Sequence, residues 1–131
     1  MFPSVFVVDD EHLIASTLSA ILNLSGYLAR FFTVAQEALV AVRVNAPDLL
    51  ISDVIMFGLS GIDLAIQMHA ECPDCKILLL SGYAETWDLV DDARLQGHDF
   101  ELLQKPIHPS ALLAKLELVR TGITLQAIGV I

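Results

Sequence analysis

Positive charge is scarce in this chain. Seven lysine and arginine residues stand against 16 aspartate and glutamate residues, which gives a formal net charge of -9. A surface of this sign repels a phosphate backbone, and the chain lacks the basic stripe that nucleic-acid binding requires. The composition therefore argues against direct binding of nucleic acid.

Cysteine and long apolar runs are also rare. The two cysteines, Cys72 and Cys75 in the segment CPDC, are too few for a disulfide framework and are compatible with a reducing compartment. Apolar runs reach only about four to six residues, far short of the roughly 20 that cross a membrane. The N-terminus has no basic region of the kind that begins a secretory signal. We therefore expect a cytoplasmic protein that does not enter a membrane.

The apolar content is sufficient for one compact domain. The chain has 131 residues, of which 55% are hydrophobic. Short apolar runs alternate with longer helical patterns, which is typical of repeated strand–helix units around a parallel sheet. We expect five such units in an α/β fold with helices on both faces of the sheet. The expected strands span residues 5–8, 27–32, 49–52, 76–80 and 100–103.

Helical spacing predicts which side chains of the first helix face the core. Five apolar residues recur at this spacing and are expected to be buried: Leu13, Ile14, Leu18, Ile21 and Leu22. The residues expected on the outside are Ser16, Ser19 and Asn23. Thr33 and Gln36 have the spacing of a capping box at the start of the second helix. The later helices are expected over residues 61–71 and 84–96, and from about Pro109 to a point before Gly122.

The last residues are not needed for the five expected strand–helix units. We expect one domain over residues 1–122, followed by an apolar tail over residues 123–131 whose role is open. The tail is interpreted as a strand-like extension, as the stub of a linker or as a homodimer contact. Because no output domain follows Gly122, we expect a domain that works by itself.

Polar residues follow four of the predicted strands. Asp9 and Asp10 follow the first strand, Asp53 the third, Ser81 the fourth and Lys105 the fifth. The carboxyl ends of parallel strands meet at one edge of an α/β sheet, where ligands bind. Each aspartate alone could be an ordinary helix cap or turn residue. Their joint placement predicts a single site.

The chemistry of these groups suits a phosphoryl group. Three clustered carboxylates repel one another unless a cation lies among them, and Mg²⁺ prefers oxygen ligands that bridge to a phosphoryl oxygen. Lys105 supplies positive charge and Ser81 a hydrogen-bond donor for phosphoryl oxygens. Asp53 is then the expected nucleophile.

Four segments of the chain together resemble a known family. They are VVDDE at 7–11, LLISDVIM at 49–56, LLLSGYA at 78–84 and QKPI at 104–107. In order, spacing and position they resemble the receiver domain of two-component response regulators, from about residue 4 to residue 120. The resemblance implies a flavodoxin-like fold with strand order 2-1-3-4-5. It also implies a phosphoprotein of phosphorelay signal transduction with magnesium as its metal.

The resemblance assigns a role to each site residue. The roles are the phospho-acceptor Asp53, the direct Mg²⁺ ligand Asp10, the acidic partner Asp9 that holds the metal mainly through water, the backbone carbonyl ligand Ile55, the switch hydroxyl Ser81, and the lysine Lys105. The bond between Lys105 and Pro106 is often cis in such domains.

The resemblance also implies the partners. The phosphoryl group would come from a phosphohistidine of a sensor histidine kinase or a histidine phosphotransfer protein. The kinase side would dock near His12 and Leu13, and an unknown output protein would be contacted directly. The domain would be regulatory rather than an enzyme, apart from self-phosphotransfer and hydrolysis of its acyl phosphate.

Two departures from the family support an alternative, a receiver-like binding module that is not phosphorylated. Leu102 stands where the family usually has an aromatic switch residue, and Phe57 stands where proline is common. Phe100 could replace the aromatic but is better explained by core packing. A magnesium-dependent hydrolase is a third interpretation, but it would need an acid at Ile55.

Two further hypotheses concern single positions. Ile55 and Tyr83 are bulky and flank the expected path of attacking water, which predicts slow self-dephosphorylation; the alternative is that they only pack. The CPDC pair lies at the end of the sheet opposite the carboxylates, where redox or zinc chemistry lacks its usual supports. The four histidines do not share metal-ligand spacing either.

Overall fold

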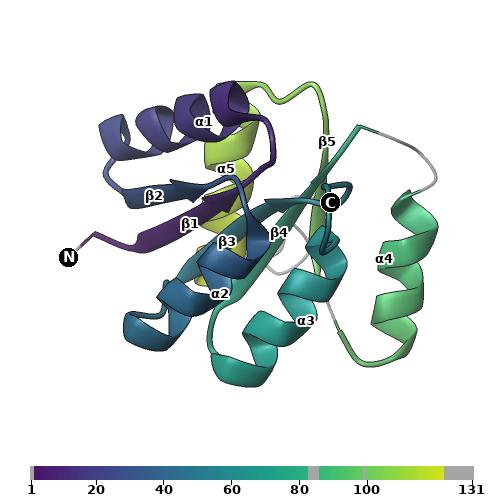
Figure 1. The fold of residues 1–131 in the computed structure, drawn as a ribbon. Coiled ribbons are helices and arrows are strands. Elements are labelled where there is room, and N and C mark those ends of the chain that lie inside the picture. Colours follow the sequence, from purple (N-terminus) through teal and green to yellow (C-terminus); the bar gives the residue numbers. More distant parts are fainter. Residues whose placement is uncertain (1, 83–85, 99, 123–131) are drawn as a thin grey trace.

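The computed structural model describes residues 2–82, 86–98 and 100–122. Strands and helices alternate throughout these residues, as the pattern of apolar runs predicts (Figure 1). The elements are β1 Ser4–Val8, α1 His12–Leu24, β2 Leu28–Phe32, α2 Ala35–Val44, β3 Leu49–Asp53, α3 Gly61–Glu71, β4 Lys76–Ser81, α4 Thr86–Leu95, β5 Glu101–Gln104 and α5 Pro109–Thr121.

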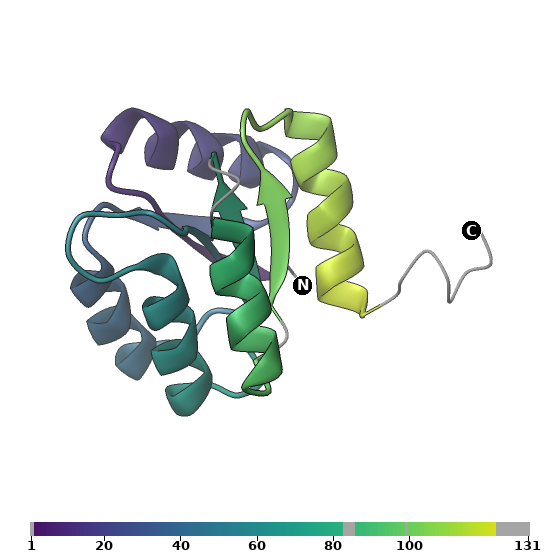
Figure 2. The ribbon, with the colours of Figure 1, turned by 90° about the vertical axis from the view of Figure 1, so that its right-hand side faces the viewer.

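The five strands of the described residues form one parallel sheet in the order β2-β1-β3-β4-β5. Helices α1 and α5 cover one face, and α2, α3 and α4 cover the other (Figures 1 and 2). Each face has its own apolar core, with Leu22 and Leu112 in one and Leu64 and Met68 in the other. The doubly wound fold and its strand order are confirmed.

Burial explains why the central strands are the easiest to find in the sequence. In β3, Leu50 packs into one core and Ile51 into the other, and both side chains are fully buried. Strands covered on both faces require continuous apolar residues. The strand β2 lies at the edge of the sheet, and its Leu28 and Arg30 are exposed. Its weaker apolar pattern follows from that position.

Two predictions about α1 are wrong. Leu13 is 76% exposed rather than buried, whereas Ser19 is buried. The buried face is Ala15, Leu18, Ser19 and Leu22, which is an i, i+3, i+4, i+7 stripe. The helix turns this stripe to the sheet, so the larger apolar side chain of Leu13 falls outside it and the small Ser19 falls inside.

The predicted capping box at Thr33 is also wrong. Helix α2 begins at Ala35, and its N-cap is Val34, which makes no side-chain capping bond. The buried face of α2 includes Ala35, Ala38 and Leu39, so packing against the sheet sets where the helix begins. None of the helices in the described ranges is long and apolar enough to cross a membrane.

Candidate functional site

Three aspartates meet at the carboxyl edge of the sheet. Asp9 and Asp10 directly follow β1, and Asp53 is the last residue of β3. One carboxylate oxygen from each residue lies within 4.8 Å of the other two. Asp9 is buried, Asp53 is partly buried and Asp10 is exposed. Adjacent parallel strands β1 and β3 therefore place three acids in one cluster that is open to solvent on the Asp10 side.

Lys105 joins the acidic cluster from the end of β5. Its Nζ lies 3.2 Å from Asp9 Oδ2 and 3.2 Å from Asp53 Oδ2. Burial alone would lower the pKa of Lys105, but attraction to Asp53 and Asp9 outweighs burial and the pKa is raised. The buried Asp9 also accepts a hydrogen bond from the Glu11 N–H at 3.0 Å. The ammonium and this N–H compensate a carboxylate that would otherwise be costly to bury.

The single ammonium leaves the cluster with excess negative charge. Burial raises the pKa of Asp53, attraction to Lys105 opposes this, and repulsion from Asp9 and Asp10 adds to it. A second cation would relieve this repulsion. Clustered carboxylate oxygens with water access on one side are the ligand set that a hard divalent ion prefers. The donor set therefore fits a metal such as Mg²⁺.

Ser81 and Ile55 stand at the same edge of the sheet as the acidic cluster. Ser81 ends β4 and is buried, and its carbonyl accepts a hydrogen bond from the Lys105 N–H at 2.7 Å. Ile55 lies two residues beyond Asp53, and its side chain is 48% exposed. The hypothesis about Tyr83 falls outside the described residues. The structure thus brings Asp53 and Lys105 together with the two other acids, and joins Ser81 to Lys105 through a backbone hydrogen bond.

The sequence gives little sign of the role of Gly61. This residue begins α3, and its N–H donates to the Val54 carbonyl at 2.9 Å. A side chain at this position would overlap the Asp53 backbone, because an added Cβ would lie 2.8 Å from the Asp53 carbonyl carbon. Gly61 therefore allows α3 to pack directly against the backbone of Asp53.

Leu102, which stands at the aromatic-switch position, and the nearby Phe100 both pack in the core. Leu102 is buried in β5, and Phe100 is fully buried, as its expected packing role requires. The Phe100 ring lies 5.4 Å from the His69 ring and 5.6 Å from the His98 ring, measured between centroids. The Lys105–Pro106 peptide bond is cis, as the resemblance implies.

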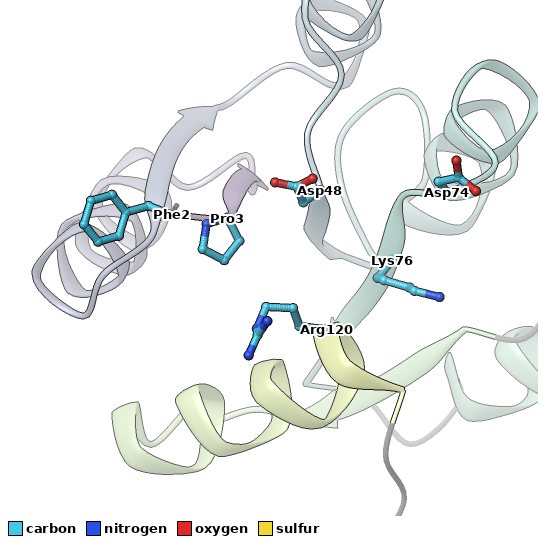
Figure 3. A pocket seen from close by; sticks show the side chains of 6 residues that line it. All are labelled: Phe2, Pro3, Asp48, Asp74, Lys76 and Arg120. Carbon is cyan, nitrogen blue, oxygen red and sulfur yellow. The ribbon is translucent and has the colours of Figure 1, made fainter.

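A hollow lies at the opposite end of the sheet. It has a volume of about 330 Å³ and lies at the amino ends of the strands (Figure 3). The side chains around it are Phe2, Pro3, Asp48, Asp74, Lys76 and Arg120. The CPDC segment lies at this end too, between α3 and β4. Neither feature is part of the acidic cluster.

The two thiols of this segment are expected to differ in reactivity. Cys75 is buried, and burial raises the pKa of its thiol to about 12, whereas Cys72 is half-buried. At pH 8 roughly one Cys75 in ten thousand would be a thiolate, which is the reactive form. Native protein treated with iodoacetamide should be alkylated at Cys72 and remain unmodified at Cys75. A Cys72→Ser variant that is alkylated at the wild-type rate would contradict this.

These features define a class of protein, the doubly wound α/β domain with an acidic site at the carboxyl edge of its sheet. The sequence matches the response regulator receiver domain over residues 5–117, and the chain belongs to this family of two-component systems. The resemblance seen in the four sequence segments is confirmed.

Individual relatives agree with this assignment. The chain is 34% identical to the phosphoglycerate transport system transcriptional regulatory protein PgtA of Salmonella typhimurium, covering 87% of this chain and 27% of that protein. It is 31% identical to the transcriptional regulatory protein FixJ of Bradyrhizobium diazoefficiens, covering 86% and 54%. The chain thus spans between about a quarter and about half of these relatives.

A solved structure gives the same result for the fold. The chemotaxis response regulator CheY4 of Vibrio cholerae, crystallised at low pH, superposes with a TM-score of 0.81 at 26% identity. The match covers 91% of this chain and 99% of that one. A receiver domain from Methanospirillum hungatei has the same fold, with a TM-score of 0.83 at 24% identity.

Proposed function

We propose that this chain is a phospho-acceptor receiver domain in which Asp53 takes a phosphoryl group from a sensor histidine kinase or a histidine phosphotransfer protein. The observation that supports it best is the contact of Asp53 with Lys105 beside two further carboxylates. The domain works in the cytoplasm and signals by protein contact. Its own chemistry is limited to phosphotransfer and to hydrolysis of the acyl phosphate.

The transfer step follows from the positions of the side chains. A carboxylate oxygen of Asp53 bonds to phosphorus while the bond from phosphorus to the histidine nitrogen breaks, and the imidazole leaves with the electron pair. The Lys105 ammonium, 3.2 Å from Asp53 Oδ2, offsets negative charge on the phosphoryl oxygens. Ser81 is the proposed hydroxyl donor to one of these oxygens.

The proposed metal is Mg²⁺. Asp10 and Asp53 would bind it directly, Asp9 mainly through water, and Ile55 through its backbone carbonyl. When bound, the ion neutralises charge on the acids and on the transferring group. Because Asp9 and Asp53 share one ammonium, the cluster favours a further cation even before phosphorylation.

The exposed residues near the acidic cluster and the net charge of the chain indicate which partners the domain binds. Leu13 and His12 at the start of α1 are exposed close to the acidic edge, which suits docking of the phosphodonor. Relatives such as FixJ are transcriptional regulatory proteins. The net charge of -9, however, disfavours direct contact between this domain and DNA. We therefore propose that the output is a protein–protein contact.

The test is phosphorylation by a small donor. Protein incubated with acetyl phosphate and Mg²⁺ should gain the mass of one phosphoryl group, and EDTA should prevent the gain. Peptide mapping after borohydride reduction should place the group on Asp53. No adduct together with no affinity for Mg²⁺ would overturn the proposal and favour a receiver-like binding module that is not phosphorylated.

Hydrolysis of the acyl phosphate is expected to depend on Ile55. Its half-exposed apolar side chain offers no hydrogen bond to an attacking water. Ile55→Asn should shorten the lifetime of the phosphorylated protein about fivefold, the effect of one hydrogen bond of about 1 kcal/mol. Ile55→Val keeps an apolar side chain and is the matched comparison. Equal lifetimes for Ile55→Asn and Ile55→Val, measured by intact mass over time, would leave Ile55 with a packing role only.

A further inference from the structure

The residue at position 57 contributes a backbone group rather than a side chain. Phe57 is 95% exposed, so its side chain makes little contact with the rest of the domain. Its N–H, however, donates a hydrogen bond to Asp10 Oδ2 at 3.0 Å. Proline has no N–H, and the family commonly has proline at this position. The departure at Phe57 therefore creates a donor that a proline could not provide.

Asp10 is the acid of the cluster that most needs such a donor. Lys105 pairs with Asp9 and Asp53, and among the described residues no salt bridge reaches Asp10. Asp10 is also the exposed member of the cluster, so solvent competes for it while two nearby carboxylates repel it. A charge-assisted hydrogen bond from a backbone N–H opposes both effects.

The hydrogen bond from Phe57 does not draw Asp10 out of the acidic cluster. With Oδ2 held by the Phe57 N–H, a carboxylate oxygen of Asp10 still lies within 4.8 Å of ligand oxygens of Asp9 and Asp53. The bond therefore fixes Asp10 in a position that is already suited to sharing a cation. Donors of this kind, which orient a metal ligand without touching the metal, typically change metal affinity by about 10- to 100-fold.

We infer that the Phe57 N–H is a positioning group that orients Asp10 and raises the affinity of the acidic cluster for Mg²⁺. The inference rests on the proposed function, because it takes Asp10 as a metal ligand. Phe57, which departs from the family pattern, then supports the metal site instead of indicating that phosphorylation has been lost.

The test compares two substitutions at one position. Phe57→Pro and Phe57→Ala both remove the exposed ring, but only Phe57→Pro removes the N–H. Titration with Mg²⁺ by calorimetry should give about tenfold weaker binding for Phe57→Pro than for Phe57→Ala. Equal affinities would overturn the role of Phe57 and leave the proposed function standing. Absence of Mg²⁺ binding in the wild type would overturn the inference, and together with the absence of a phosphoryl adduct it would overturn the proposed function as well.

The amide proton resonance of Phe57 provides a check that needs neither proline nor metal. It should move upfield in Asp10→Ala protein, and an unchanged resonance would contradict the hydrogen bond.

Discussion

Asp53→Asn is expected to abolish the phosphoryl adduct that acetyl phosphate forms in the presence of Mg²⁺. The amide has nearly the same shape as the carboxylate, but it is not a nucleophile at neutral pH. It also removes one of the three charges that hold the metal in the cluster. Both effects act on the same step, so the loss measured by intact mass should be complete.

The control is an aspartate far from the site. Asp92 is exposed on α4, and Asp92→Asn should form the adduct to the wild-type extent. An adduct on Asp53→Asn at the wild-type level would refute the acceptor assignment and would direct attention to Asp10, the exposed acid of the cluster.

Loss of the adduct should not come from unfolding. The pKa of Asp53 is raised in the folded protein, mainly by burial, so ionised Asp53 destabilises the fold at neutral pH. This destabilisation develops as the pH rises through the ordinary pKa of an aspartate, and the neutral amide removes it. In buffer without divalent ions, the unfolding temperature of Asp53→Asn should equal or exceed that of the wild type.

The fold follows closely from local sequence because its central strands are covered on both faces. Continuous apolar runs mark β3 and β4, and the polar residue that ends each run marks the edge where the site forms. Parallel pairing of β1 with β3 then brings Asp9 and Asp53 to the same point on this edge. A site built from strand ends can therefore be predicted from a single sequence.

Features that depend on tertiary packing could not be predicted in the same way. The rotation of α1 about its axis decides that Ser19 is buried and Leu13 is exposed, and an apolar pattern that wraps around the helix does not fix that rotation. The hydrogen bond from Phe57 to Asp10 joins residues that are 47 positions apart through a backbone group that every residue except proline has. The side chain at position 57 gives no sign of it.

Gly61→Ala is expected to destabilise the domain by about 2 kcal/mol. Alanine favours a helix over glycine by about 1 kcal/mol, which would stabilise α3 if nothing else changed. The added Cβ, however, would overlap the Asp53 carbonyl oxygen, and would lie 2.8 Å from the Asp53 carbonyl carbon and 3.0 Å from Val54 Cα. All three are backbone atoms at or just beyond the end of β3, so they cannot move aside as a flexible side chain can. Overpacking of this kind costs about 1–3 kcal/mol, and more where backbone must shift.

Gly82→Ala provides the matched comparison for this substitution. Among the residues that the structure describes, a Cβ at Gly82 would meet the Lys105 side chain alone, at 3.9 and 4.0 Å, which is ordinary contact distance. Its free energy of unfolding should match that of the wild type or exceed it by about 0.5 kcal/mol, through reduced entropy of the unfolded chain. Urea denaturation of the three proteins measures the difference. Equal stability of Gly61→Ala and Gly82→Ala would contradict this prediction, because it would mean that α3 has room to move away from β3. The close packing of α3 against the Asp53 backbone would then not be what fixes the position of the acceptor.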